Sequence, residues 1–260
     1  IALGSGSARG WAHIGILRAL ADLGLRPAVV TGASVGALVG AAFANDKLDA
    51  LEAWVCALAQ RDVWHLIDAT FRGGGIMTGN RLMDAIAVGV GDTPIEQLPV
   101  AFGAVATDLY TGEEVWLREG PMMRVVRASS GVPGLFAPAW HAGRWLIDGG
   151  VVNPVPVSVC RAFGARIVVA VTLSSDSVNR GSVIHDQEVL AELSMPPEEA
   201  KLPGKNGRAA IHLLHRQIFG KSDGAPGISA VMMDAINITQ DRIARSRLAG
   251  DPPDVTISPK

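Results

Sequence analysis

At residues 29–38 the chain reads Val29-Val30-Thr31-Gly32-Ala33-Ser34-Val35-Gly36-Ala37-Leu38. This stretch predicts a strand, a sharp turn and a helix, and the rest of the sequence is interpreted from it. The β-branched residues at its start predict a strand, and the apolar run that continues to residue 43 predicts a helix. Between them, Gly32 and Gly36 bound a sharp turn with Ser34 at its apex. This Gly-x-Ser-x-Gly pattern is typical of a nucleophile elbow, in which glycines let strand and helix approach closely and the turn exposes the serine hydroxyl. The pattern also occurs by chance, so an ordinary strand-to-helix loop is the alternative interpretation.

The residues upstream of this stretch predict a strand, a loop and a helix. Residues 1–3 have the apolar character of a buried strand end, residues 4–10 are a small-residue loop, and apolar positions at helical spacing predict a helix over 11–23. A parallel strand-helix-strand unit places both of its loops at the same edge of the sheet. We therefore expect backbone N–H groups of the loop to lie beside Ser34 and to stabilise a negative oxygen there. The expected donors are Gly6, Ser7, Ala8 and Arg9.

Composition bounds the class of protein. The chain has 260 residues, of which 48% are hydrophobic and 30 are glycine, and this is typical of an α/β domain with many tight turns. We expect a single domain over residues 1–260. The formal net charge is −2 and no Lys/Arg-rich run is present, so we expect no nucleic-acid partner.

The cysteines and the remaining patterns indicate a protein without metal or disulfide. Cys56 and Cys160 have no Cys-x-x-Cys spacing, so we expect two buried free thiols. No His/Asp cluster has the spacing of metal ligands, and we expect neither a metal nor a cofactor. No apolar run reaches the ~18 residues that a membrane-spanning helix needs, and no leader pattern opens the residues given. We therefore expect a cytoplasmic protein.

Downstream of the elbow the apolar pattern alternates between helix and strand. We expect helices at 47–59, 79–88, 122–130 and 155–163, and strands at 101–106, 114–117, 144–147 and 167–171, the first two strands as a hairpin. Repetition of this kind predicts an α/β fold.

Two segments stand apart from that repetition. The polar residues 174–208 predict a mobile insertion, which is followed by expected helices at 208–219 and 228–248 and a strand at 254–257. The apolar region from Trp64 to Met77 contains three successive glycines. It fits either a satellite of the core or the wall of a pocket for an apolar substrate.

Spacing alone leaves the proton acceptor of Ser34 open. The default partner of an elbow serine is a histidine held by an acid, in the order Ser, Asp, His. Asp148 is well placed, because Gly149 and Gly150 directly after a strand let a turn bring its carboxylate close to another loop. The histidines are poorer candidates: one lies within the first helix, two in expected loops, and three follow Asp148 without distinguishing neighbours. They are His13, His65, His141, His185, His212 and His215.

Five segments taken together resemble the bacterial patatin-like phospholipases, and their order and spacing match as well. They are Gly-Ser-Gly-Ser-Ala-Arg-Gly-Trp-Ala-His-Ile-Gly at 4–15, Gly-Ala-Ser-Val-Gly at 32–36, Ala-Thr-Asp-Leu-Tyr-Thr-Gly at 106–112, Ala-Ser-Ser-Gly-Val-Pro-Gly at 128–134 and Asp-Gly-Gly-Val-Val-Asn-Pro at 148–154. The resemblance covers about residues 1–173 and the terminal segment 245–255.

The resemblance implies a three-layer α/β/α fold with a mainly parallel central sheet. It also implies a serine acyl hydrolase, either a lipid acyl hydrolase or a carboxylesterase, that works through an acyl-enzyme and makes transient contact with a membrane surface. The family uses a Ser–Asp dyad, which puts the nucleophile on Ser34 and the base on Asp148. The implied oxyanion hole consists of Gly6, Ser7, Ala8, Arg9 and Gly10, and the supporting glycines are Gly32, Gly36, Gly149 and Gly150.

The loop departs from the family pattern at two positions. Ser5 and Ser7 stand where the family commonly has glycine; serine keeps the N–H donor, but its Cβ restricts the backbone. Three alternatives stay open: a Ser-His-Asp esterase, a catalytically silent binding or regulatory module on the same fold, and a dinucleotide-binding enzyme. The last has little support, because Arg9 stands at the third glycine position and no acidic residue ends the strand at 29–31.

Overall fold

A computed structural model describes residues 1–59, 62, 65–70, 74–173 and 228–259. The chain divides into two compact units, Ile1–Ser175 with Thr239–Lys260, and Asp176–Ile238. The first unit contains the sheet and the candidate site. Of the second, residues 228–238 form the beginning of helix α10 (Ile228–Gly250). The expected insertion at 174–208 and the expected helix at 208–219 lie outside the described residues.

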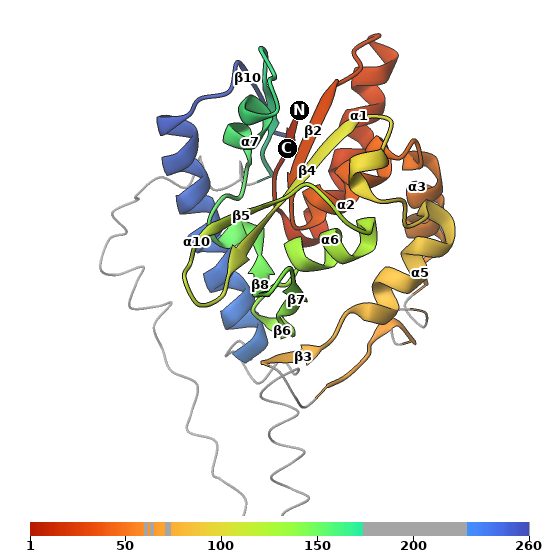
Figure 1. Cartoon of the computed structure of the whole chain (residues 1–260), viewed down its shortest axis with the longest axis vertical. Helices are drawn as coiled ribbons and strands as arrows, with labels where there is room; N and C mark the ends of the chain where they lie inside the picture. Colours follow the sequence, from red (N-terminus) through yellow and green to blue (C-terminus); the bar gives the residue numbers. More distant parts are fainter. Residues whose placement is uncertain (60–61, 63–64, 71–73, 174–227, 260) are drawn as a thin grey trace, which may run out of the picture. The chain divides into compact units, whose positions relative to one another are not determined.

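One half of the central sheet is parallel (Figure 1). Its strands pair in the order β10 (Val255–Ile257), β9 (Val169–Val171), β1 (Ala2–Leu3), β2 (Val29–Ala33) and β4 (Ala101–Asp108). Because β1 and β2 are parallel neighbours, the loops that follow them open at the same edge. The expected strand-helix-strand unit at the start of the chain is confirmed.

The other half of the sheet is antiparallel. β5 (Glu114–Leu117) and β8 (Arg144–Asp148) both pair with β4, and β7 (Ala139–His141) pairs with β8. β5 can return directly beside β4 because a tight turn joins them, in which Asp108 Oδ1 accepts the N–H groups of Tyr110 and Thr111. The hairpin is therefore confirmed, but the expectation of strand-helix repetition throughout was wrong for residues 109–148.

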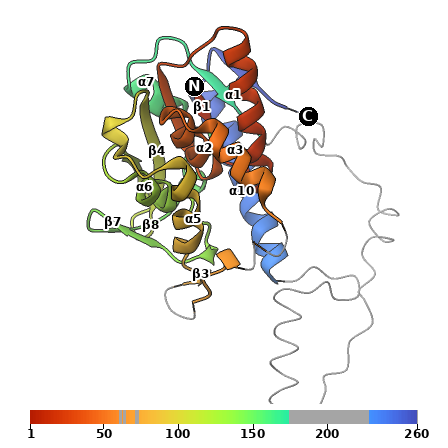
Figure 2. The ribbon, with the colours of Figure 1, turned by 90° about the vertical axis from the view of Figure 1, so that its right-hand side faces the viewer.

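Helices cover both faces of the sheet, so the fold is a three-layer α/β/α arrangement (Figure 1 and Figure 2). One face is covered by α1 (Ala12–Asp22), α2 (Val35–Ala44), α3 (Leu48–Ala57), α5 (Asn80–Val90) and α6 (Met122–Ser129). The other is covered by α7 (Val157–Ala162) and the part of α10 around Ala244. Leu3 belongs to the first core and its neighbour Ala2 to the second, because successive strand side chains point to opposite faces.

Short elements complete the fold and correct several expected boundaries. Part of the glycine-rich loop forms the 3-10 helix η1 (Ser7–Trp11), and two further 3-10 turns are η2 (Ile95–Gln97) and η3 (Gly149–Val151). A separate two-stranded sheet pairs β3 (Gly75–Met77) with β6 (Gly134–Phe136). His141 lies in β7 rather than in a loop.

The expectation of two buried thiols was wrong for Cys56. Cys160 is buried, whereas Cys56 is exposed on α3. That helix buries Leu51, and five residues later a helix has turned by roughly 140°, which carries Cys56 away from the core.

Candidate active site

Ser34 and Asp148 come together because two strands end at adjacent positions on one edge of β4. Ala33, the last residue of β2, pairs with Val105, and Asp148, the last residue of β8, pairs with Ala106. β5 pairs with both Val105 and Ala106, so it occupies the opposite edge and leaves β2 and β8 to share this one. The two strands run toward each other, since β2 is parallel and β8 antiparallel to β4. Ser34, which follows Ala33, therefore lies beside Asp148.

The elbow holds Ser34 in a strained conformation. Its φ of 57° and ψ of −125° lie in a region that residues with a side chain rarely adopt. The flanking glycines make the close approach possible: a Cβ at Gly32 would lie 2.4 Å from Gly36 O, and a Cβ at Gly36 would lie 2.3 Å from Leu3 O. Backbone packed against Gly32 and Gly36 therefore holds the strained turn in place on both sides of Ser34.

Ser129, which sequence reasoning did not single out, fixes this turn from α6. Its Oγ accepts the backbone N–H of Ser34 at 3.1 Å and donates to Val105 O at 2.6 Å. Ser129 is fully buried. The segment Ala-Ser-Ser-Gly-Val-Pro-Gly contained the signal, because a serine on the apolar side of a helix needs a hydrogen-bond partner.

Asp148 is fully buried and is held by hydrogen bonds at every polar atom except one. Its N–H donates to Gly131 O at 3.0 Å, and its backbone oxygen accepts from Thr107 Oγ1 at 2.8 Å. The side-chain Oδ1 accepts the N–H of Gly150 at 2.7 Å and Nε2 of Gln240 at 3.4 Å. Oδ2 has no hydrogen-bond partner among the described residues.

The environment of Asp148 suits a general base. Burial raises the pKa of this carboxyl to about 6, and the Ser34 hydroxyl and the Gly150 N–H act in the opposite direction. The Ser34 side chain is thus close enough to lower the pKa of Asp148, although Oδ2 makes no hydrogen bond that meets the usual geometric limits among the described residues. A carboxylate with a raised pKa and an unpartnered oxygen can accept a proton at neutral pH.

The glycine-rich loop lies against the elbow. A Cβ at Gly10 would lie 2.0 Å from Val35 Cγ1, so glycine at this position lets η1 pack on the residue after Ser34. Ser7 has a φ of 48° and is exposed, which is the conformation that makes glycine common there. Close packing therefore explains the glycine at position 10, and the positive φ at position 7 explains why glycine is common where this chain has Ser7.

Not every expected oxyanion donor in this loop is available. The N–H of Ser5 donates to Pro154 O at 2.8 Å, and the N–H of Arg9 donates to Gly6 O at 3.1 Å. The guanidinium of Arg9 donates to Leu173 O at 3.3 Å. The geometry thus favours the N–H groups of Gly6 and Ala8 at the start of η1, because the first N–H groups of a helix have no partner within it.

His13 is a structural residue of this loop. It is fully buried on α1, and its Nε2 lies 2.7 Å from Gly4 O. Burial lowers the pKa of His13 to about 4, while the hydrogen bond to Gly4 opposes that change. The ring is therefore neutral at pH 7 and donates from Nε2. Within the part of the chain that the structure describes, neither His65 nor His141 is hydrogen-bonded to Ser34 or Asp148, and the other three histidines lie outside that part.

Arg127 is a buried cation that sequence reasoning missed. Its Nε donates to Thr78 O and its Nη2 to Ala137 O, each at 2.5 Å, and the guanidinium lies over the Phe136 ring. Burial lowers the pKa of Arg127, whereas the nearby Asp68 raises it. Arg127 therefore ties α6 to the small sheet of β3 and β6. The helix contains two arginines, Arg124 and Arg127, and the available signal was that Arg127 follows the apolar Met123 by four residues and so lies on the same side of the helix.

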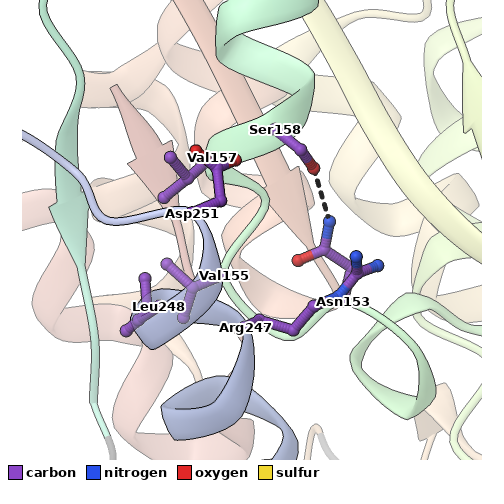
Figure 3. A pocket seen from close by; sticks show the side chains of 7 residues that line it. All are labelled: Asn153, Val155, Val157, Ser158, Arg247, Leu248 and Asp251. Carbon is purple, nitrogen blue, oxygen red and sulfur yellow. Dashed lines mark hydrogen bonds between the residues drawn. The ribbon is translucent and has the colours of Figure 1, made fainter.

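A small hollow in the structure lies elsewhere, between α7 and α10 (Figure 3). Its lining residues include Val157, Ser158, Arg247 and Leu248, but neither Ser34 nor Asp148. Asn153 Nδ2 donates to Ser158 Oγ there at 3.1 Å. The hollow belongs to helix packing rather than to the candidate site.

Three further expectations concern ligands and surroundings. Within the described ranges, no group of three or more His, Cys, Asp or Glu side chains could hold a metal ion. No helix in those ranges is both long enough and apolar enough to cross a membrane. Of the expected pocket wall, Trp64 lies outside the described residues, while Ile76 and Met77 are half-buried in β3.

Comparison with known proteins finds a family model and several relatives that match this chain. The family model described as patatin-like phospholipase matches residues 1–161. An uncharacterized NTE family protein of Mycobacterium tuberculosis (strain H37Rv) is 32% identical over 295 residues, which cover 99% of this chain and 82% of the relative. Patatin-like phospholipase domain-containing protein 7 of Rattus norvegicus is 31% identical over 195 residues, covering 71% of this chain and 14% of that protein. The lysophospholipase nte1 of Emericella nidulans is 28% identical over 221 residues, covering 79% and 14% respectively.

Proposed function

We propose that this chain, which belongs to the patatin-like phospholipase family, is a serine hydrolase that cleaves carboxylic esters of lipids through a dyad of Ser34 and Asp148. Family membership implies a hydrolase of lipid acyl groups. The dyad, its oxyanion donors and the ester class of the substrate are our proposal. Access to such a substrate would bring the protein into transient contact with a membrane surface.

The observation that carries the proposal is the unpartnered Oδ2 of Asp148 beside Ser34. Buried carboxylate oxygens normally accept hydrogen bonds, so an exception next to an elbow serine calls for a functional reason. The register of β2 and β8 on β4 supports it as well, because it brings the two residues together from distant parts of the chain.

The mechanism is acyl transfer in two steps. Ser34 Oγ attacks the ester carbonyl while Asp148 accepts its proton, and N–H groups at the start of η1 stabilise the oxyanion. The tetrahedral intermediate collapses, the proton passes to the leaving alcohol, and an acyl-enzyme on Ser34 is left. A water molecule then attacks the acyl carbon while Asp148 accepts its proton, and this proton passes to Ser34 Oγ as the bond to the acyl group breaks and the fatty acid leaves.

The test is hydrolysis of p-nitrophenyl acyl esters of increasing chain length, followed by lysophospholipids. Ser34→Ala and Asp148→Asn are each expected to lower kcat by at least about 10⁴-fold, with the fold retained by circular dichroism. Ser246→Ala, an exposed change on α10, is the control and should retain full activity. A fluorophosphonate probe should label the wild type at Ser34. An unlabelled wild type would favour a catalytically silent module, and an active Asp148→Asn with an inactive His212→Ala or His215→Ala would favour a Ser-His-Asp esterase.

A further inference from the structure

A buried chain of hydrogen bonds joins the two ends of the protein at the candidate base. Ser5 Oγ donates to Gln240 Oε1 at 3.0 Å, and Gln240 Nε2 donates to Asp148 Oδ1 at 3.4 Å. Ser5 follows β1, and Gln240 lies on α10 in the same compact unit. The exposed fractions are 7% for Ser5, 8% for Gln240 and 0% for Asp148. All three groups are therefore shielded from water, where a hydrogen bond to a charged group has its largest effect.

The orientation of the Gln240 amide follows from its partners. An ionised carboxylate only accepts hydrogen bonds, so the amide nitrogen must face Asp148 and the amide oxygen must face the Ser5 hydroxyl. Gly150 makes this approach possible, because a Cβ there would lie 2.5 Å from Gln240 Nε2. The arrangement thus depends on a glycine that the Asp-Gly-Gly motif supplies.

We propose that Ser5 and Gln240 are positioning residues, which hold Asp148 Oδ1 so that Oδ2 is left to accept the proton of Ser34. The inference rests on the proposed function. It gives a reason for Ser5, which stands where related loops commonly have glycine: its hydroxyl holds the amide oxygen of Gln240. Gln240 lies beyond residues 1–161, the part that the family model matches, so this chain supplies the contact from its own C-terminal helix.

The chain should also influence the protonation of the base. Donors to an ionised carboxylate favour its charged form, so loss of the Gln240 N–H, which lies 3.4 Å from Oδ1, should raise the pKa of Asp148. Titratable groups on the elements around Asp148 are not among the causes of its present pKa. They are Asp108 of β4, Arg124 and Arg127 of α6, and Asp241 of α10.

The experiment compares Gln240→Met, which keeps the side-chain length but removes both hydrogen bonds, with Ser5→Ala and with the Ser246→Ala control. In Gln240→Met, kcat for a p-nitrophenyl ester should fall about tenfold at pH 7, with KM unchanged because Gln240 touches no substrate. The midpoint of the rise of kcat/KM with pH should move upward by roughly one pH unit. Ser5→Ala should show a smaller change of the same kind. In the double variant the two effects should not add, since the residues act in one chain.

Two results would overturn the inference. A fall of kcat by the same factor at every pH would mean that Gln240 only supports the fold, and unchanged kinetics would mean that it has no role at the base. A readout that needs no activity separates this inference from the proposed function. The free energy of unfolding is measured from pH 4 to pH 8 for the protein with Asp148 and for Asp148→Asn, and the difference between the two curves reports the pKa of Asp148. The same pair is then measured in the Gln240→Met background. An upward displacement there supports the inference even for a chain without esterase activity, and identical curves refute it.

Discussion

The parallel and antiparallel halves of the sheet each supply one half of the candidate dyad, and they do so in different ways. In the parallel half, Ser34 follows β2 directly and sits in a turn whose strain is built from its own neighbours. In the antiparallel half, Asp148 ends β8 as a fully buried carboxyl whose surroundings come from β4, α6 and α10. The position of the nucleophile thus depends more on local backbone shape, and that of the base more on distant contacts.

The same difference extends to charge. The buried titratable group near the loop of the parallel half is His13, which burial keeps neutral. In the antiparallel half, the fully buried Asp148 must be ionised to act as a base although burial opposes that form. Raising the pH therefore increases both the contribution of His13 to stability and the activity that depends on ionised Asp148, but it lowers the contribution of Asp148 to stability.

The largest expected effect on stability comes from adding a Cβ at a glycine of each half where neighbouring backbone leaves no room for one. A Cβ at Gly149 would lie 2.0 Å from Val105 O, and one at Gly36 would lie 2.3 Å from Leu3 O. Because both obstacles are backbone atoms, Gly149→Ala and Gly36→Ala should each lower the free energy of unfolding by more than about 3 kcal/mol, measured by urea denaturation. Gly15→Ala on α1 is the matched control, since no atom lies within 4 Å of its Cβ. It should raise the free energy of unfolding by about 0.5–1 kcal/mol.

If alanine is tolerated at Gly149 but not at Gly36, the two halves of the sheet do not depend equally on their glycines. That result would mean that the turn holding the base can relax whereas the elbow cannot. Equal losses of stability would show that the backbone of β1 beside Gly36 and that of β4 beside Gly149 are equally unable to move aside.

The next effect is a gain in stability from Asp148→Asn. The pKa of Asp148 is about 6 in the folded protein, above the ordinary value of 3.8. Between these values the folded state holds a proton that the unfolded state has released, so the free energy of unfolding falls as pH rises through this window. Relative to wild type, Asp148→Asn should therefore gain stability from pH 4 to pH 7, up to about 3 kcal/mol. Thermal or urea unfolding at several pH values measures the difference, and a difference that stays flat would contradict the raised pKa.

The smallest of the three effects has the opposite sign and concerns His13→Gln. The pKa of His13 is about 4 in the folded protein, below the ordinary value of 6.5. On acidification through this window the unfolded state takes up a proton that the folded state refuses, so the wild type loses stability. His13→Gln keeps a donor for Gly4 O and should lose roughly 2–3 kcal/mol less than wild type between pH 7 and pH 4.5. Urea unfolding across this range is the measurement, and parallel curves for the two proteins would refute a neutral buried imidazole.

Much of the parallel half could be predicted from the sequence. The elbow, the loop before the first helix and their position at one sheet edge follow from periodicity and from the handedness of a strand-helix-strand unit. Apart from the hairpin of β4 and β5, which a local turn signals, the antiparallel half could not be predicted in the same way, because strand pairing is a contact between segments that periodicity does not connect. The interpretation as continuous repetition failed there for that reason. The expectation of a buried Cys56 failed because apolar neighbours in sequence do not say which side of a helix faces the core.

By itself, the sequence determined the nucleophile candidate, the family and the α/β class of this protein, because glycine spacing and apolar periodicity are local properties of the chain. How Asp148 is held follows from the packing of the folded chain and cannot be read from sequence alone. The ends of β2 and β8 on one edge of β4, the clamp of Ser129 and the chain from Ser5 through Gln240 join residues that are up to 235 positions apart. Such contacts depend on how strands and helices pack in three dimensions, and the burial that raises the pKa of Asp148 exists only once they have packed.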